Sequence, residues 1–314
     1  MKSFSSKILL LGEYGLLLGS EGFALPYPAF SGRFDQVASG LSDEASQKDS
    51  NHQLQLLAEY LAADAAGFDY LQLKTFGHDV LHGLCFTSNI PQGYGVGSSG
   101  ALTAALFDRY ALPETKKRPL AEVRKMLAKI EQFYHGTSSG LDPLVSYVDV
   151  PLSIGTSGEV RLHNALTFLS WNRGIANEDR QQNRPKLFLI DTLMSASTGN
   201  LVEQFLLRSQ DPEFKALLEG VYFPATTKAI DALIGGNHPA FEDAMFVLSE
   251  FQSNHFGPMI PPKIQPHFAN GLLSGHYLLK LCGSGGGGFM LGCAINTVAT
   301  ENYFRGIGLP LIWL

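Results

Sequence analysis

The chain has 314 residues, of which 45% are hydrophobic and 17% are charged, a composition typical of a globular protein with one large domain or two smaller ones. The formal net charge of −6 and the lack of a long basic run argue against nucleic-acid binding, which needs a basic face. No stretch approaches the roughly 18 apolar residues of a membrane helix, and three cysteines without CxxC spacing predict reduced thiols. We therefore expect a cytoplasmic protein with no nucleic-acid or membrane partner.

The first elements are predicted from apolar runs and their spacing. Residues 7–18, KILLLGEYGLLL, read as strand, turn and strand. Glu13 interrupts the apolar run and no small-residue cleavage site follows, so a β-hairpin is favoured over a signal peptide. Leucines at helical spacing predict a helix over 53–66, and strands are predicted over 70–75 and 83–87.

The middle of the chain is predicted to contain two helices around glycine-rich loops. Residues 93–100 form the first loop, and a helix over 101–112 is expected to end before Pro113. A second helix over 119–134 has one apolar stripe, formed by Leu120, Val123, Leu127, Ile130 and Tyr134. A loop with the sequence HGTSSGLDPL follows, with a short helix or turn after it.

The second half of the chain mixes helices and strands without regular alternation. Strands are predicted over 159–163, 166–171, 186–191, 277–282 and 289–294, and helices over 199–209, 212–218, 224–236 and 241–255. The polar segment 172–184 is the predicted domain junction. Because the order lacks repeated βαβ units, the sequence favours the α+β class over a doubly wound sheet.

The segment PQGYGVGSSGALTAAL, residues 91–106, is the strongest functional signal. Four glycines and two serines precede an Ala/Leu run that predicts a helix. Glycines let backbone N–H groups approach an anion, and a helix N-terminus adds unpaired donors and partial positive charge. Ser98 and Ser99 could donate to a phosphate, ligate Mg²⁺ or simply cap the helix. The sequence therefore predicts a phosphate site, with a plain capped turn as the alternative.

Two better-known glycine motifs are matched by letter, at three places, but not by context. Residues 95–100 and 283–288 fit G-x-G-x-x-G, yet neither lies in a first βαβ unit. Residues 136–140, GTSSG, fit G-x-S-x-G, but a predicted helix rather than a strand precedes them. An oxidoreductase that uses NAD therefore remains only a weak alternative, and no P-loop motif is present.

Two acidic residues lie near the end of the second predicted helix and just after the loop that follows it. Asp142 comes after a Gly/Ser loop, and Glu131 lies eleven residues earlier, beside the apolar stripe. Such a pair could divide two tasks, with one carboxylate holding a metal and the other orienting or deprotonating a hydroxyl. Taken alone, Glu131 fits a solvated helix face, Asp142 fits a turn or cap, and Lys7 fits a surface position.

Together these motifs resemble the GHMP kinase family, named for galactokinase, homoserine kinase, mevalonate kinase and phosphomevalonate kinase. KILLLGEYGLLLGSEGFALP, PQGYGVGSSGAL and KLCGSGGGGF are similar to the three family motifs in the family's order. HGTSSGLDPLVS is similar to the segment that carries the catalytic aspartate in mevalonate kinases, the members that the chain resembles most. The matches span residues 7–289.

The resemblance implies an α+β fold of two domains. These are an N-terminal ATP-binding domain of the ribosomal protein S5 domain 2-like type over 1–180 and a ferredoxin-like C-terminal domain over 181–314. It also implies transfer of the γ-phosphoryl group of ATP to a small-molecule alcohol, with Mg²⁺ as cofactor. A homodimer is left open.

The resemblance also assigns roles to individual positions. Asp142 and Lys7 fall on the catalytic aspartate and lysine, and Ser99 and Glu131 on the Mg²⁺ ligands. ATP-binding positions are Gly93, Gly95, Gly97, Ser98, Ser99, Gly285 and Gly286. Positions that face the acceptor are Glu13, Tyr14, Thr198, Gly283 and Ser284.

Some positions depart from the family pattern and leave the acceptor open. Tyr14 replaces the usual histidine of the first motif, Ala196 stands where mevalonate kinases have an arginine, and Cys282–Ser284 replaces Thr-Gly-Ala. An arginine often binds a carboxylate in bidentate fashion, so its absence bears on mevalonate itself. An ATP-dependent decarboxylase of the mevalonate diphosphate type and a catalytically silent nucleotide-binding module are the alternatives.

Overall fold

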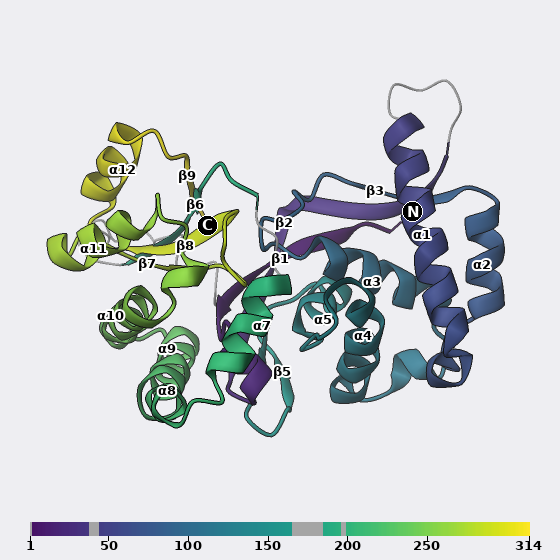
Figure 1. Cartoon of the computed structure of the whole chain (residues 1–314), viewed down its shortest axis with the longest axis horizontal. Coiled ribbons are helices and arrows are strands. Elements are labelled where there is room, and N and C mark those ends of the chain that lie inside the picture. Colours follow the sequence, from purple (N-terminus) through teal and green to yellow (C-terminus); the bar gives the residue numbers. More distant parts are fainter. Residues whose placement is uncertain (1, 38–43, 165–184, 196–198) are drawn as a thin grey trace. The chain divides into compact units, whose positions relative to one another are not determined.

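The structure is a computed structural model that describes residues 2–37, 44–164, 185–195 and 199–314 (Figure 1). Contacts divide the chain into two compact units, each built from separate stretches of sequence. Unit 1 comprises Met1–Lys7, Leu25–Pro91 and Gly97–Asp149, and unit 2 comprises Ile8–Ala24, Gln92–Val96 and Val150–Leu314. The predicted boundary at 180/181, the polar junction and the predicted strand 166–171 lie outside the described residues, so the domain limits stay a prediction.

Unit 1 combines the ends of two long strands with a group of helices. Its elements, or the parts of them that it contains, are β1 (Phe4–Leu11), β2 (Gly22–Gln36), α1 (Glu44–Ala63), η2 (Ala65–Phe68), α2 (Leu73–Leu81), β3 (Leu84–Ser88), α3 (Ser98–Tyr110), η3 (Thr115–Lys117), α4 (Leu120–His135) and α5 (Leu141–Val148). β2 pairs antiparallel with β3, with Gly32 opposite Ser88 and Gln36 opposite Leu84. Helices α3, α4 and α5 pack against one another, and α1 packs against β3 and α2 (Figure 1).

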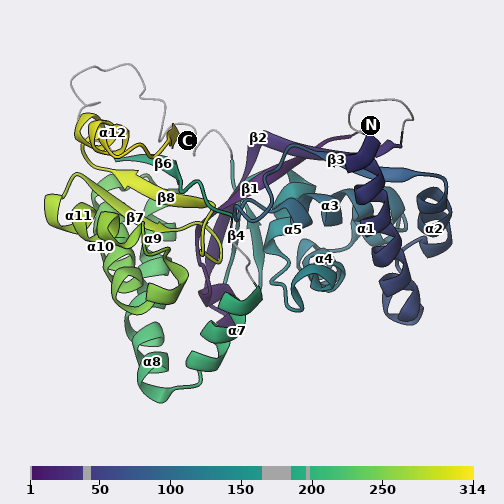
Figure 2. The ribbon, with the colours of Figure 1, turned by 45° about the horizontal axis from the view of Figure 1, so that its top comes forward.

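Unit 2 is built around an antiparallel sheet in the order β7-β8-β6-β9. Its elements after the end of α5 are β4 (Leu152–Ile154), β5 (Val160–Leu162), β6 (Lys186–Asp191), α7 (Gly199–Arg208), α8 (Pro212–Leu217), the π-helical segment η5 (Leu218–Tyr222), α9 (Phe223–Gly235), α10 (His238–His255), η6 (Gly257–Met259), α11 (Gln265–Ser274), β7 (Tyr277–Leu281), β8 (Phe289–Ala294), α12 (Thr297–Gly306) and β9 (Leu311–Trp313). Both α10 and α11 pack on β7, and α9 packs on α10 (Figure 2). The start of β2 pairs with β4, which pairs with β5.

Most predicted elements are confirmed, and the errors have physical reasons. Residues 70–75 were predicted as a strand, but residues 73–81 form the helix α2, which buries Phe76 and Val80 on one face. A short apolar run does not distinguish strand from helix by periodicity alone. The predicted strand at the end of 7–18 is wrong as well, because Gly15–Leu18 forms the single helical turn η1 before β2.

The long strand β2 was missed because Pro26 and Pro28 lie inside it. Proline lacks a ladder donor and usually argues against a strand. Residues two apart in a strand point their N–H groups to the same side, so both prolines weaken only one edge of β2. The pairing that β2 makes with β3 and β4 begins and ends away from these prolines.

Two expectations from composition can be compared with the described residues. Cys85, Cys282 and Cys293 are free thiols, as predicted, and all three are buried. Among the helices that the structure describes, none combines the length and the apolar character needed to cross a bilayer.

Candidate active site

Unit 1 contains a close ion pair formed by two predicted catalytic residues. Lys7 Nζ lies 2.8 Å from Asp142 Oδ2. The Lys7 side chain is only 2% exposed, whereas the Asp142 side chain is 31% exposed. The lysine is therefore held inside the unit, and the carboxylate that it contacts remains accessible from solvent.

The local backbone explains how Asp142 reaches this position. Asp142 lies in the first turn of α5, which follows Gly140 at a left-handed φ of 72°. Gly100 of α3 lies so close that a Cβ atom there would stand 3.1 Å from the Asp142 Cβ and 3.0 Å from its carbonyl carbon. The glycine thus allows the first turns of α3 and α5 to approach each other.

Glu131 is buried next to this pair and accepts two hydroxyl hydrogen bonds. Ser99 Oγ donates to Glu131 Oε1 at 3.0 Å, and Ser138 Oγ donates to Oε2 at 2.5 Å. Burial, with the nearby charge of Asp142, raises the pKa of Glu131 to about 7, although both hydroxyls and Lys7 oppose the rise. A solvated helix face, the alternative for Glu131, is therefore wrong.

The start of α3, which contains the second half of the glycine-rich loop, lies against Lys7. The helix begins at Ser98, and its N-cap is Gly97 at φ 79°, without a side-chain cap. A Cβ at Gly97 would stand 2.8 Å from Lys7 Cγ, so the loop lies directly on the lysine stem. The first turn of a helix leaves its amides without intrahelical partners, which favours an anion there. The capping alternative for the serines is not observed.

In unit 2 the first half of that loop packs against the C-terminal glycine loop. Gly93 and Gly95 both have φ of 74°, and a Cβ at Gly95 would meet the Cys282 carbonyl oxygen at 2.3 Å. The Phe289 amide donates to the Tyr94 carbonyl at 3.3 Å. The glycine-rich loop around residues 94–95 and the C-terminal glycine segment 282–289 are therefore in direct backbone contact.

The C-terminal glycine loop, residues 283–288, is also tied to its own unit. The Gly286 amide donates to the Met259 carbonyl at 2.7 Å, and the Gly288 amide donates to the Met194 carbonyl at 2.6 Å. The Gly286 amide therefore already has a hydrogen-bond partner. This predicted ATP-binding residue would contribute through its lack of a side chain rather than through its N–H group. A Cβ at Gly285 would also meet the Met259 carbonyl oxygen, at 2.3 Å.

Glu13 and Tyr14, predicted to face the acceptor, are buried in unit 2. Tyr14 has a positive φ of 61°, packs on the rings of Phe205 and Phe256, and donates its hydroxyl to the Ser284 carbonyl. Glu13 forms an ion pair with Lys280, and both side chains are fully buried. Thr198 and Ala196 lie outside the described residues.

Two residues of these clusters were missed from the sequence. Ser138 is the central serine of GTSSG, and its hydroxyl binds Glu131 instead of acting in a nucleophile elbow, since α4 rather than a strand precedes it. Lys280 is the first residue of KLCGSGGGGF, and the apolar residues around it were a signal of a buried strand that could have drawn attention to it. The dinucleotide interpretation of residues 95–100 is not supported either, because β3 pairs antiparallel with β2.

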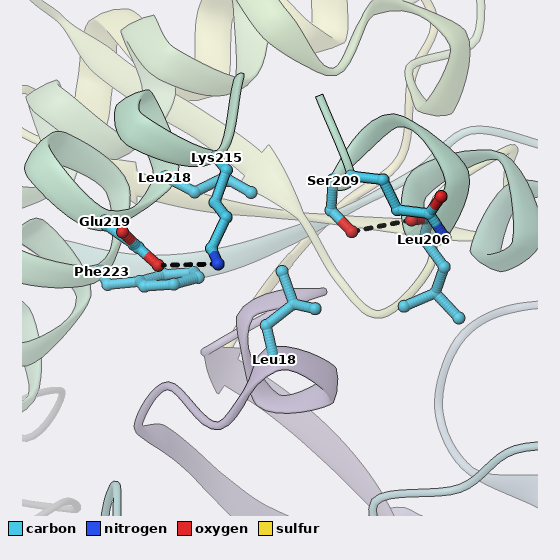
Figure 3. A pocket seen from close by; sticks show the side chains of 8 residues that line it. Leu18, Leu206, Ser209, Lys215, Leu218, Glu219 and Phe223 are labelled. Carbon is cyan, nitrogen blue, oxygen red and sulfur yellow. Dashed lines mark hydrogen bonds and ion pairs between the residues drawn. The ribbon is translucent and has the colours of Figure 1, made fainter. Parts of the chain in front are cut away.

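A cavity of about 650 Å³ lies apart from these residues in unit 2 (Figure 3). Its walls are mainly apolar and include Leu18, Leu206 and Phe223, and the Lys215–Glu219 ion pair at 3.8 Å lies on one side. None of the predicted site residues lines it.

Comparisons with known proteins show which proteins the chain is similar to. Residues 56–149 match the family model described as the N-terminal domain of GHMP kinases. A mevalonate kinase of Thermococcus sibiricus is 26% identical over 256 residues, which cover 72% of this chain and 64% of that protein. The aligned region thus spans somewhat less than two thirds of that relative.

Solved structures extend the likeness to nearly the whole chain. The L. major mevalonate kinase in complex with R-mevalonate has a TM-score of 0.59 at 18% identity and covers 98% of this chain and 90% of its own. The Streptococcus pneumoniae phosphomevalonate kinase in complex with phosphomevalonate and AMPPNP has a TM-score of 0.60 at 12% identity and covers 100% and 99%. The chain therefore has the α+β fold of the GHMP kinases, and the resemblance to that family is confirmed.

The contact between the glycine motifs can be tested with two glycines of nearly equal φ. Gly288 has φ of 66° and its Cβ would meet Tyr94 Cα at 2.3 Å, whereas Gly236 has φ of 67° with open space around it. Gly236→Ala should cost about 1–2 kcal/mol for the left-handed backbone. Gly288→Ala should cost about 1–3 kcal/mol more, because backbone atoms must move. Urea unfolding of both variants measures the difference, and equal losses would contradict the close approach of Gly288 to Tyr94.

The buried carboxylate of Glu131 predicts a pH dependence of stability in the metal-free protein. Its folded pKa of about 7 lies above the ordinary value of 4.5, so folding favours the protonated form. The favourable contribution is complete below pH 4.5 and is lost as pH rises to about 7, by at most about 3 kcal/mol. Urea unfolding at pH 5 and pH 8 should show this loss in wild type and little of it in Glu131→Gln. An equal loss in the variant would assign it to other groups.

Proposed function

We propose that the protein is an ATP- and Mg²⁺-dependent kinase that transfers the γ-phosphoryl group of ATP to the hydroxyl of a small molecule. The observation that carries the proposal is the unit 1 cluster, in which the Lys7–Asp142 pair lies next to Glu131 and its hydrogen-bonded Ser99. The kinase names of the relatives and the fold support the same activity.

The chemistry assigns a distinct task to each residue of the pair. Asp142 is the partly exposed carboxylate and would accept the proton of the acceptor hydroxyl. The acceptor oxygen bonds to the γ-phosphorus, and the bond from this phosphorus to the β–γ bridging oxygen breaks, which releases ADP. Lys7 would hold Asp142 in place and stabilise negative charge on the phosphoryl group during transfer.

The residues present fit a magnesium ion. Ser99 and Glu131 would hold Mg²⁺, which supplies charge neutralisation on the β- and γ-phosphates. The buried, hydrogen-bonded carboxylate of Glu131 is disfavoured in its charged form until a cation compensates it. The described residues contain no group of three or more His, Cys, Asp or Glu side chains arranged for a metal. Proteins usually bind Mg²⁺ through one or two carboxylates together with substrate phosphates.

The glycine-rich loop would bind the ATP phosphates. Ser98 and Ser99 occupy the first turn of α3, where amide groups and the helix dipole favour an anion. Gly93, Gly95 and Gly97 all have left-handed φ values, which aim successive amides in ways that other residues rarely adopt. The similar phosphomevalonate kinase that was solved with AMPPNP supports the use of ATP.

Mevalonate is the first acceptor to test. A mevalonate kinase is the relative matched by sequence, and one matched structure was solved with R-mevalonate. Tyr14 gives a specific reason to test other acceptors as well, because it replaces the family histidine and its ring is buried against Phe205 and Phe256.

The test is ³¹P NMR of the purified protein with Mg-ATP and a panel of alcohols. The panel contains mevalonate, phosphomevalonate, homoserine, galactose and other sugars. We expect a new phosphoester signal with one acceptor and an equal amount of ADP. The signal should disappear when Mg²⁺ is chelated.

Two other outcomes would favour the alternatives. Release of CO₂ together with ADP and phosphate from mevalonate diphosphate would indicate a decarboxylase. Direct binding of ATP without transfer to any acceptor would indicate a silent nucleotide-binding module and would contradict the proposed activity.

A further inference from the structure

A fully buried ion pair in unit 2 has no part in the proposed phosphoryl transfer. Lys280 Nζ donates to Glu13 Oε1 and also to the Leu281 carbonyl at 2.9 Å. Both side chains are 0% exposed. Lys280 lies near the end of β7, and Glu13 lies in the turn that follows β1.

Burial of this pair is not explained by stability alone. Removal of two charges from water is costly, and well-packed apolar residues of similar volume are often at least as stable. Buried pairs of this kind can instead define a unique geometry. The question is then which two parts of the molecule the pair holds in register.

Two further routes join the same two segments. Tyr222 donates to the Glu13 carbonyl at 3.2 Å, and Gln252 donates to the Tyr222 hydroxyl at 3.0 Å and accepts from the Leu281 amide at 2.7 Å. Tyr14 donates directly to the Ser284 carbonyl. The Glu13–Tyr14 turn is thus bound to the strand before the glycine loop and to the loop itself.

The route through Tyr222 passes through an irregular part of the backbone. Tyr222 is the last residue of η5, a π-helical segment between α8 and α9. Such segments are rare in helices and are frequent at functional sites. Here the segment places a fully buried hydroxyl between Glu13 and Gln252.

The C-terminal glycine loop, which these contacts hold in place, packs against the glycine-rich loop. Residues 282–289 meet the glycine-rich loop through Cys282 against Gly95 and through Gly288 and Phe289 against Tyr94. A shift of the strand end at Lys280 would therefore move the loop and the Tyr94–Gly95 backbone together.

We propose that Lys280 and Glu13 are positioning residues that set the place of the glycine loop 283–288, and through it of residues 94–95, without contacting nucleotide or acceptor. The functional consequence rests on the proposed kinase activity, whereas the structural consequence does not. Glu13 then acts from within unit 2 rather than as an acceptor ligand.

The test compares Glu13→Gln/Lys280→Met with Lys215→Met/Glu219→Gln. The second pair carries the same kinds of substitution at an exposed ion pair of the same unit, with side chains 61% and 59% exposed (Figure 3). Hydrogen–deuterium exchange is measured for peptides covering 283–289, with β8 residues 290–294 as an internal reference. Tyr14→Phe, which keeps the buried ring and removes only the hydroxyl, is a milder third variant.

We expect exchange in 283–289 to become faster by on the order of tenfold in the buried double variant, with β8 unchanged and the exposed double variant like wild type. Tyr14→Phe should show a smaller increase confined to the same peptides. Unchanged exchange in 283–289 in both buried-site variants would overturn the proposal. A uniform increase over all of unit 2 would also overturn it, because it would reveal a role in stability only.

A second measurement separates this proposal from the proposed function. Affinity for a fluorescent ATP analogue is measured by direct titration, and kcat and KM with the identified acceptor. We expect the buried double variant to raise Kd for the analogue and KM for ATP by on the order of tenfold, more than it lowers kcat. If wild type transfers no phosphoryl group, the kinase proposal fails while the exchange result still decides the positioning role.

Discussion

Asp142→Asn is expected to lower kcat by about 10²–10⁴-fold, the range in which a general base contributes to catalysis. Asparagine keeps the shape of the side chain but cannot accept the acceptor proton and no longer carries the charge that faces Lys7 Nζ at 2.8 Å. ATP affinity should stay near the wild-type value, because the predicted phosphate contacts come from the start of α3. The measurement is phosphoryl transfer from Mg-ATP to the acceptor found by NMR.

A matched control is Asp49→Asn on the exposed face of α1. This variant should retain wild-type kcat and affinity. Wild-type turnover in Asp142→Asn would remove Asp142 from the chemistry. If Asp142→Asn loses both ATP binding and its folded structure, the Lys7–Asp142 pair serves mainly to stabilise the fold of unit 1.

Lys280→Met alone is expected to destabilise the protein by about 3–5 kcal/mol, because the fully buried Glu13 carboxyl group loses the Lys280 ammonium. It must then either stay charged away from water or take up a proton, and both cost free energy. Addition of Glu13→Gln should recover most of this loss, since both charges are then removed. Thermal and urea unfolding of the two single variants and the double variant form a double-mutant cycle.

The exposed pair again supplies the comparison. Lys215 Nζ lies 3.8 Å from Glu219 Oε1, and the two residues are four apart on one helical face. A double-mutant cycle on this pair should give a coupling free energy of about 0.2–1 kcal/mol. A loss below about 1 kcal/mol in Lys280→Met would mean that water, a proton or a local rearrangement compensates Glu13 in the variant, and it would contradict the expected penalty.

Much of the candidate site was predictable because the residues that form it lie in short, local sequence patterns. The glycine-rich loop and the following helix could be read from residues 91–106, and α3 does begin at Ser98. Asp142 and Glu131 were singled out as a pair of carboxylates, and the structure places both near Lys7. The family resemblance favoured these positions as functional over ordinary structural positions such as a turn or a solvated helix face. Their catalytic roles remain predictions.

Other parts could not be predicted because their meaning depends on partners far away in the chain. Ser138 looks like a loop serine until α4 places Glu131 beneath it. Lys280 lies in an apolar strand that α10 and α11 cover, but its partner Glu13 lies 267 residues away and no local pattern identifies it. Tyr14 occupies a motif position that suggests ligand contact, yet its ring is packed among phenylalanines.

The sequence by itself determined the α+β class, the positions of the glycine loops and the helices with a clear apolar stripe such as α4, because these follow from backbone freedom and side-chain periodicity. Only the tertiary structure decided that residues 73–81 form a helix, that β2 continues past two prolines, and that Glu13 binds Lys280 across 267 residues of chain. Short apolar runs and single charged residues are locally ambiguous, and the free energy of burial, which settles them, depends on contacts distant in sequence.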